Sequence, residues 1–172
     1  INQTTLRILG LYRGDYTKSM HLREIARGVK VDVKAVQLQM KRLKKINVIL
    51  DTLKGRNREY YLNLNNQITK YHMILAEAFA SIIYLSENFV IKKVVSEVGE
   101  KVEGSIILFG SFAKGQVTPD SDIDILVLAE GELDRNAFSE AGRLVNREIN
   151  VKRMRREQVL EGLEEGDPLV RE

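Results

Sequence analysis

The chain has 172 residues, of which 44% are hydrophobic and 30% are charged, and its formal net charge is +3. This balance is typical of a globular protein with a packed core, built as one large domain or two small ones. The sequence contains no cysteine, which excludes a disulfide framework and a thiolate zinc site. Its two histidines are too few and too far apart to indicate a metal cluster. Its apolar runs are far shorter than the ~20 residues of a membrane span, so we expect a cytoplasmic protein that does not enter a membrane.

Three regions of the sequence differ in charge and in their helix and strand signals, and together they predict an α+β protein. Residues 1–64 are basic and helix-rich and end in a hairpin. Residues 65–103 indicate long amphipathic linking helices, and residues 104–172 alternate strand and helix signals. The sequence therefore predicts two functional domains, 1–64 and 104–172, joined by the helices of 65–103.

In the first region, apolar spacing predicts a short helix around residues 6–12 and a second helix over 21–29. Asp32 is a good N-cap for a third helix, and Asn47 suits the left-handed turn that ends it. Two short strands, 48–50 and 59–62, then form a hairpin whose turn is the basic segment 54–58.

This order of elements resembles a winged helix-turn-helix DNA-binding domain. The resemblance implies that the third helix is a recognition helix and that residues 54–58 form a basic wing. Lys30 departs from the pattern, because the turn between the second and third helices often has glycine.

The charge distribution supports DNA as a partner. Between Asp32 and Arg58 there are eight bases and two acids, so the local charge is +6, twice that of the whole chain. Such a face can neutralise phosphates, and an outward glutamine can read an adenine edge. The alternative is a solvated basic helix in a domain that only packs. We expect double-stranded DNA to contact Lys34, Gln37, Lys41, Arg42, Lys45, Lys54, Arg56 and Arg58.

The middle region carries an apolar stripe and a helix break near residues 87–88. A stripe of this kind usually covers a neighbouring sheet. The alternative is a homodimer face, because winged-helix proteins often need a dimer to read two half-sites. The stripe consists of Ile68, Tyr71, Leu75, Ala78, Phe79 and Ile82.

The last region contains a phosphate-binding pattern. A buried strand over 105–109 ends in Gly110-Ser111, and a short helix follows. Glycine lets a backbone approach a ligand closely, and a hydroxyl beside helix amides suits phosphate oxygens. The candidate nucleotide-binding residues are Gly110, Ser111, Lys114 and Ser121.

Asp122 and Asp124 stand at alternate positions at the start of the next strand, so they share one face of it. Carboxylates about 6–7 Å apart along a strand can both reach one or two divalent metals. A bound cation would also remove the repulsion between them. The sequence therefore predicts a site for Mg²⁺ (or Mn²⁺) next to the phosphate-binding pattern.

Gly-Ser, ten further residues and Asp-x-Asp before an apolar run form a pattern that resembles the nucleotidyltransferases of the DNA polymerase β superfamily. The similarity is greatest to the minimal domains of archaea and bacteria. It implies a small mixed sheet, a nucleoside triphosphate bound by Ser111 and nearby amides, and Mg²⁺ held by Asp122 and Asp124. The implied reaction is in-line attack of a hydroxyl on the α-phosphate, with release of pyrophosphate.

Active members of this superfamily carry a third carboxylate on a later strand, and the matching position here is Asn150. An amide oxygen can ligate a metal, but it cannot take a proton at neutral pH. Glu148, two residues earlier, is the alternative third carboxylate, or else a solvated charge at the strand end. Both are candidate catalytic residues with Asp122 and Asp124.

Three functions remain open at this point. The first is a DNA-binding nucleotidyltransferase, and the second is a transcriptional regulator whose weakened transferase domain senses nucleotide. The third is an antitoxin-type nucleotidyltransferase that blocks a partner toxin, with nucleotidylation of the toxin as one way to do so. The sequence does not choose between a protein, a nucleic-acid end and a small molecule as acceptor.

Overall fold

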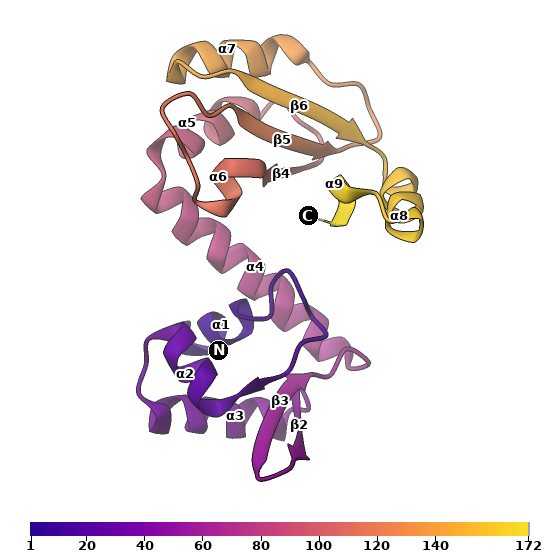
Figure 1. Ribbon diagram of the computed structural model, residues 1–172. Helices are drawn as coiled ribbons and strands as arrows, with labels where there is room; N and C mark the ends of the chain where they lie inside the picture. Colours follow the sequence, from indigo (N-terminus) through magenta and orange to yellow (C-terminus); the bar gives the residue numbers. More distant parts are fainter. Residues whose placement is uncertain (172) are drawn as a thin grey trace. The chain divides into compact units, whose positions relative to one another are not determined.

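The computed structural model describes residues 1–171, which divide into two compact units. The first unit is Ile1–Tyr84 and the second begins at Leu85 (Figure 1). Each contains helices and a three-stranded sheet, which confirms the α+β class. The division falls inside the long helix α4 (Gln67–Glu87), and α5 (Phe89–Val98) follows after the predicted break.

The first unit has the order of elements of a winged helix. Its helices are α1 (Gln3–Gly10), α2 (Leu22–Val29) and α3 (Val33–Lys45). The strands β1 (Met20–His21), β2 (Ile49–Lys54) and β3 (Asn57–Leu62) form an antiparallel sheet of order β1-β3-β2. The hairpin strands are longer than predicted, because Lys54 pairs with Asn57 and only two residues remain for the turn. β1 was not predicted, since two residues show no alternation.

The helix ends of this unit follow from local chemistry. The Asp32 carboxylate accepts a hydrogen bond from the Lys34 amide over 2.8 Å and caps α3, as predicted. Lys30 and Asn47 both adopt left-handed backbone, with φ of 56° and 57°. The departure from glycine at Lys30 therefore leaves the turn in place, at a conformational cost of about 1 kcal/mol.

The core of the first unit lies between its helices and its sheet. Tyr12 is fully buried, and its hydroxyl donates to the Tyr60 carbonyl over 2.9 Å. Burial, and then the charge of Glu24, raise the pKa of the Tyr12 hydroxyl. The helix α4 adds Met73 and Ala76 to this core.

The apolar stripe of α4 is largely exposed. Its exposed fractions are 47% for Ile68, 59% for Tyr71, 49% for Leu75 and 64% for Ile82. The residues of α4 that are buried, Thr69, Met73 and Ala76, form a different side of the helix. The predicted stripe thus does not supply the buried side of this helix, and its use as a dimer face stays a prediction.

The second unit contains the small mixed sheet that the sequence predicted. β5 (Ile123–Leu128) is central, with β4 (Ser105–Phe109) antiparallel on one side and β6 (Ile149–Met154) parallel on the other. The remaining helices are α6 (Gly110–Lys114), α7 (Arg135–Val145), α8 (Arg156–Glu165) and α9 (Pro168–Arg171). Figure 1 shows α7 lying along β6, and α8 and α9 beyond the end of that strand.

The two faces of this sheet differ. Ile123, Ile125 and Val127 are buried on one face. The helix α7 packs on that face, since Gly142 lies against Ile149, the register partner of Ile123. Asp124 points to the opposite face, so the residues with predicted chemistry lie away from the packed core.

No single helix in the described residues is long and apolar enough to cross a membrane; only α4 and α5, a bent pair, pass that test of length and composition together.

Candidate functional site

Gly110 links β4 to α6 and lies against the Asp124 carboxylate. Its φ is +68°, in the left-handed region that favours glycine. Phe109, the residue before it, is the register partner of Asp124 across β4 and β5. A Cβ at position 110 would collide with Oδ2 of Asp124 and lie 3.1 Å from its Cγ. Both the turn and the close approach to the carboxylate therefore require glycine here.

Asp122, Asp124 and Asn150 come together at the start of β5. Asn150 is the register partner of Asp124 on the parallel strand β6. Its Nδ2 donates to Oδ1 of Asp124 over 3.2 Å and to Oδ2 of Asp122 over 3.5 Å. One side-chain amide thus bridges both predicted metal ligands.

Glu148 takes part in this cluster through its backbone. Its carbonyl accepts a hydrogen bond from the Ile123 amide over 2.9 Å, while the residue is exposed. In the part of the chain that the structure describes, no group of three or more His, Cys, Asp or Glu residues is arranged to hold a metal ion. Glu148 as a third carboxylate therefore stays a prediction.

The predicted phosphate ligands lie on α6 and on the loop that follows it. Ser111 is half-buried in the first turn of α6, and Lys114 ends the helix. Ser121 has a second role that the sequence did not reveal. Its Oγ accepts from the Thr118 amide over 2.8 Å and lies 3.0 Å from Oγ1 of Thr118. The Ser121 hydroxyl thus closes the loop directly before Asp122.

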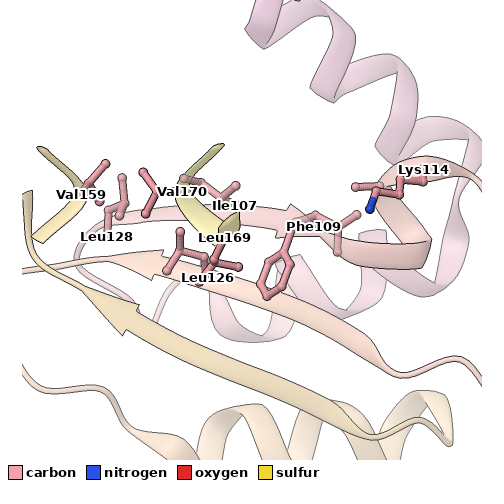
Figure 2. A pocket seen from close by; sticks show the side chains of 10 residues that line it. Ile107, Phe109, Lys114, Leu126, Leu128, Val159, Leu169 and Val170 are labelled. Carbon is pink, nitrogen blue, oxygen red and sulfur yellow. The ribbon is translucent and has the colours of Figure 1, made fainter. Parts of the chain in front are cut away.

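An apolar groove of about 300 Å³ lies on the sheet face that carries Asp124 (Figure 2). Phe109 and Ile107 of β4 pair with Asp124 and Leu126 of β5, so the groove and the carboxylate share that face. Lys114 lies at the Phe109 end of the groove in Figure 2. Further lining residues are Leu128, Val159, Leu169 and Val170.

A second hollow of about 460 Å³ lies along β6. It is lined by Asn150 and Lys152 of that strand and by Arg135 and Ser139 of α7. The cluster of Asp122, Asp124 and Asn150 therefore has the α6 turn on the β4 side and a hollow with two basic residues on the β6 side.

The helix α3 turns basic side chains away from the core. Its buried residues are Val36, Gln39, Met40 and Leu43. The five predicted DNA contacts of this helix are all exposed: Lys34, Gln37, Lys41, Arg42 and Lys45. The exposed face has the form of a recognition helix, while the contact with DNA stays a prediction.

The wing is less free to bind than the sequence suggested. Arg58 and Lys44 both make ion pairs with Asp51, whose side chain is only 8% exposed. A hydrogen bond from Lys44, and then one from Arg58, hold the pKa of the Asp51 carboxyl below its usual value of 3.8. Part of the charge of Arg58 is therefore compensated within the domain.

Lys54 is also paired, whereas Arg56 lies at the tip of the wing. The Lys54 ammonium lies 3.6 Å from Oε1 of Glu59. A hydrogen bond from Ser19, together with the charge of Lys54, holds the pKa of Glu59 below its usual value. Arg56 occupies the two-residue turn and is exposed, while its contact with DNA stays a prediction.

Sequence reasoning missed the basic side of α2. Arg23, Arg27 and Lys30 line a shallow hollow of about 650 Å³ that also borders Asp32 and Val33 at the start of α3. The four-residue spacing of Arg23 and Arg27 on a helix could have revealed a shared outward face. In helix-turn-helix domains the first of the two helices crosses the DNA backbone, so this hollow extends the candidate DNA surface.

Comparison with known proteins assigns the second unit. Residues 91–167 match the family described as nucleotidyltransferase domain. The chain is also 34% identical over 85 residues to MJ0604 of Methanocaldococcus jannaschii, a proposed protein adenylyltransferase; the match covers 38% of this chain and 85% of that protein. The chain belongs to the nucleotidyltransferase domain family. The matched region encloses Gly110, Asp122, Asp124 and Asn150, so the cluster lies within the nucleotidyltransferase domain.

Solved structures similar to this nucleotidyltransferase-domain protein include one transcription regulator and one bacterial protein, YusO. MepR, a transcription regulator of the Staphylococcus aureus multidrug efflux pump MepA, has a TM-score of 0.40 at 19% identity, covering 58% of this chain and 70% of that chain. YusO of Bacillus subtilis has a TM-score of 0.40 at 19% identity, covering 59% of this chain and 77% of that chain. The winged-helix fold of the first unit follows from its own topology.

Proposed function

We propose that this protein transfers a nucleotidyl group from a nucleoside triphosphate to an acceptor hydroxyl and binds double-stranded DNA through its winged helix. The observation that carries the transferase proposal is the contact of Gly110 with Asp124. It joins the turn that is predicted to bind phosphate to a carboxylate that shares its strand face with Asp122. A site for a metal alone, or for a phosphate alone, would not need both halves of this arrangement.

The residues present fit a hard divalent cation. Asp122 and Asp124 offer carboxylate oxygens on one face, which is the donor set that Mg²⁺ and Mn²⁺ prefer when phosphate oxygens complete the shell. Asn150 fits as well, once its amide turns to present oxygen instead of nitrogen. When bound, the ion supplies charge neutralisation at the α-phosphate while the bond to pyrophosphate breaks.

The chain's own residues would bind and orient the substrate. Ser111, Lys114 and the amides at the start of α6 hold the phosphates on the β4 side of Asp124. In-line displacement places the attacking hydroxyl opposite the leaving pyrophosphate, on the side of β6 and Lys152. The hydroxyl oxygen bonds to the α-phosphorus and its proton passes to water, because Asn150 cannot accept it.

ATP as donor and a protein as acceptor are supported by the proposed activity of the Methanocaldococcus jannaschii relative. The second candidate function, a DNA-binding regulator that senses nucleotide, is favoured by Asn150. Its amide donates to both carboxylates where a third carboxylate would hold the ion and help remove the proton. A general base commonly contributes ~10²–10⁴-fold to rate, so binding without efficient transfer is the expected behaviour of this candidate.

The test separates both candidates and both modules. The protein is incubated with Mg²⁺ or Mn²⁺, each α-labelled nucleoside triphosphate and a lysate, beside a double variant Asp122→Asn with Asp124→Asn. Label in a macromolecule that disappears in the double variant supports transfer. Nucleotide binding without label, which the same variant abolishes, supports the sensor. The transferase proposal fails when the double variant binds and labels like wild type.

We also propose a homodimer. The exposed residues Ile68, Tyr71, Leu75 and Ile82 follow one another at intervals of three, four and seven positions along α4, the spacing of a two-stranded helix pair. Light scattering at several concentrations should give a dimer mass for wild type and a monomer mass for Ile82→Lys. A monomer at all concentrations for the wild type would exclude this proposal.

A further inference from the structure

Arg147 connects the two halves of the nucleotidyltransferase signature. Its Nη1 donates to the Thr118 carbonyl over 3.0 Å and to the Ser121 carbonyl over 2.9 Å. Its guanidinium also lies 5.9 Å from the centre of the Phe112 ring, within the range of a cation–π contact. Ser121 directly precedes Asp122, and Phe112 is the buried residue of α6. One side chain therefore contacts both the loop that leads to the carboxylates and α6, the helix that is predicted to bind phosphate.

The backbone of Arg147 is held in place by the end of α7. Asn146 has left-handed backbone with φ of 52°, and the Arg147 amide donates to the Gly142 carbonyl over 3.0 Å. A Cβ at Gly142 would come within 2.6 Å of the Arg147 carbonyl oxygen. On the other side, the Glu148 carbonyl accepts from the Ile123 amide. The guanidinium thus extends from a turn that is fixed to both α7 and β5.

The loop itself needs such a support. Residues 115–122 lie between α6 and β5 without regular structure. Inside the loop, the hydrogen bonds of Ser121 to Thr118 close a turn, but they do not tie this turn to the sheet. Arg147 supplies this connection, because a charged donor bound to two carbonyls holds both in one geometry.

We propose that Arg147 is a positioning residue for nucleotidyl transfer: it holds loop 115–122 and α6 in one arrangement, so that Asp122 lies beside Asp124 when metal and nucleotide bind. This inference rests on the proposed function. Arg147 acts through the loop and not by contact with the reacting atoms. Its removal therefore loosens the loop and weakens binding of the metal–nucleotide complex.

The chain offers a matched control in Arg153. Its Nη1 also donates to two backbone carbonyls, those of Glu130 over 3.3 Å and Gly131 over 2.8 Å. Arg153 lies on β6, beside a loop that contributes nothing to the signature. Arg147→Ala and Arg153→Ala thus remove the same charge and the same type of contact from two places in one domain.

The experiment uses the whole chain and two measurements. Hydrogen–deuterium exchange of the protein without ligand reports on residues 115–122, and Mn²⁺ with ATP measures the affinity of the site. We expect Arg147→Ala to speed exchange in this loop and to weaken Mn²⁺–ATP binding roughly tenfold or more, because both charged hydrogen bonds to the loop are lost. Arg147→Lys keeps the charge and the alkyl chain, so it should fold normally. Its loop should nevertheless exchange as fast as in Arg147→Ala, because an ammonium cannot reproduce the flat, two-acceptor contact of a guanidinium.

Three results would overturn the proposal. One is loop exchange in Arg147→Ala equal to wild type. Another is full affinity in Arg147→Lys, which would mean that the charge acts directly on phosphate. The third is an equal loss in Arg153→Ala, which would indicate a general effect on stability. Wild type that binds no Mn²⁺–ATP would instead refute the proposed function, and loop exchange in the two arginine variants would still decide whether Arg147 holds the loop.

Discussion

Asp124 and Asn150 are register partners on neighbouring parallel strands, and the Asn150 amide donates to the Asp124 carboxylate over 3.2 Å. The same amide reaches Asp122 at 3.5 Å. In the absence of a cation, this donor reduces the repulsion between the two carboxylates. The residue that departs from the superfamily pattern therefore stabilises the ligand-free site, and in the proposed reaction it cannot accept the proton of the attacking hydroxyl.

Asn150→Asp should make the protein depend on a cation. The change replaces a hydrogen-bond donor with a third negative charge beside two others, which should lower stability in chelator by about 1–2 kcal/mol. Mg²⁺ or Mn²⁺ should restore it, because three carboxylates bind a divalent ion more tightly than two. Thermal melts with chelator and with each metal measure both effects. Equal melting temperatures in all conditions would show that position 150 does not contact a metal site.

The labelling assay applied to the same variant distinguishes the two candidate functions. A nucleotide sensor that has lost its third carboxylate should gain transfer in Asn150→Asp. An efficient transferase that works with Asn150 should gain little or nothing.

Gly110→Ala should destroy nucleotide binding, whereas Gly115→Ala should not. Both glycines have left-handed backbone, with φ of 68° and 67°, so alanine at either position strains the backbone by roughly 1–2 kcal/mol. A Cβ at position 110 would also strike the Asp124 carboxylate, while a Cβ at position 115 meets no atom within 4 Å. Urea melts should give the backbone loss alone for Gly115→Ala and a larger loss for Gly110→Ala, and titration with Mn²⁺–ATP should show full binding only in Gly115→Ala. Equal binding by both would refute the close contact of Gly110 with the metal ligand.

The sequence predicted those parts of the structure that depend on local chemistry. The cap at Asp32 and the left-handed turn at Asn47 each follow from one residue type at one position, and the shared face of Asp122 and Asp124 follows from their alternate spacing. The contact of Arg147 with the Ser121 carbonyl joins residues 26 apart in the sequence. It depends on how β6 pairs with β5, and no local pattern encodes that register.

The wing shows the same limit. Charge counting treats Arg58 and Arg56 as equivalent, because both lie in one basic segment. The hairpin register places Asp51 opposite Tyr60. Arg58 lies two residues before Tyr60 on the same strand, so it is the diagonal neighbour of Asp51 on the same face of the hairpin. An ion pair therefore forms at Arg58 and not at the exposed tip residue Arg56.

This difference predicts unequal effects on DNA affinity. Lys41→Ala and Arg56→Ala should each weaken binding to duplex DNA. Each should also make the negative slope of log K against log salt less steep by about 0.9, the value for one phosphate contact. Arg58→Ala should change that slope less, because Asp51 already compensates its charge. Binding titrations at several salt concentrations measure the three slopes. Three equal slopes would mean that DNA displaces Asp51 from Arg58, and three unchanged slopes would contradict DNA binding by this surface.

Asp51 should make the winged helix sensitive to acid. The hydrogen bond from Lys44, with that from Arg58, lowers the pKa of its carboxyl in the folded state below the usual 3.8. Its stabilisation is therefore complete above the pKa of the unfolded chain and is lost as the pH falls through the lower folded value. Asp51→Asn removes this contribution, so wild type should be more stable than the variant at pH 6, and the difference should shrink between about pH 5 and pH 3. Urea melts of both proteins across that range measure the difference. A gap that stays constant with pH would mean that the Asp51 side chain stabilises the hairpin by contacts other than its charge.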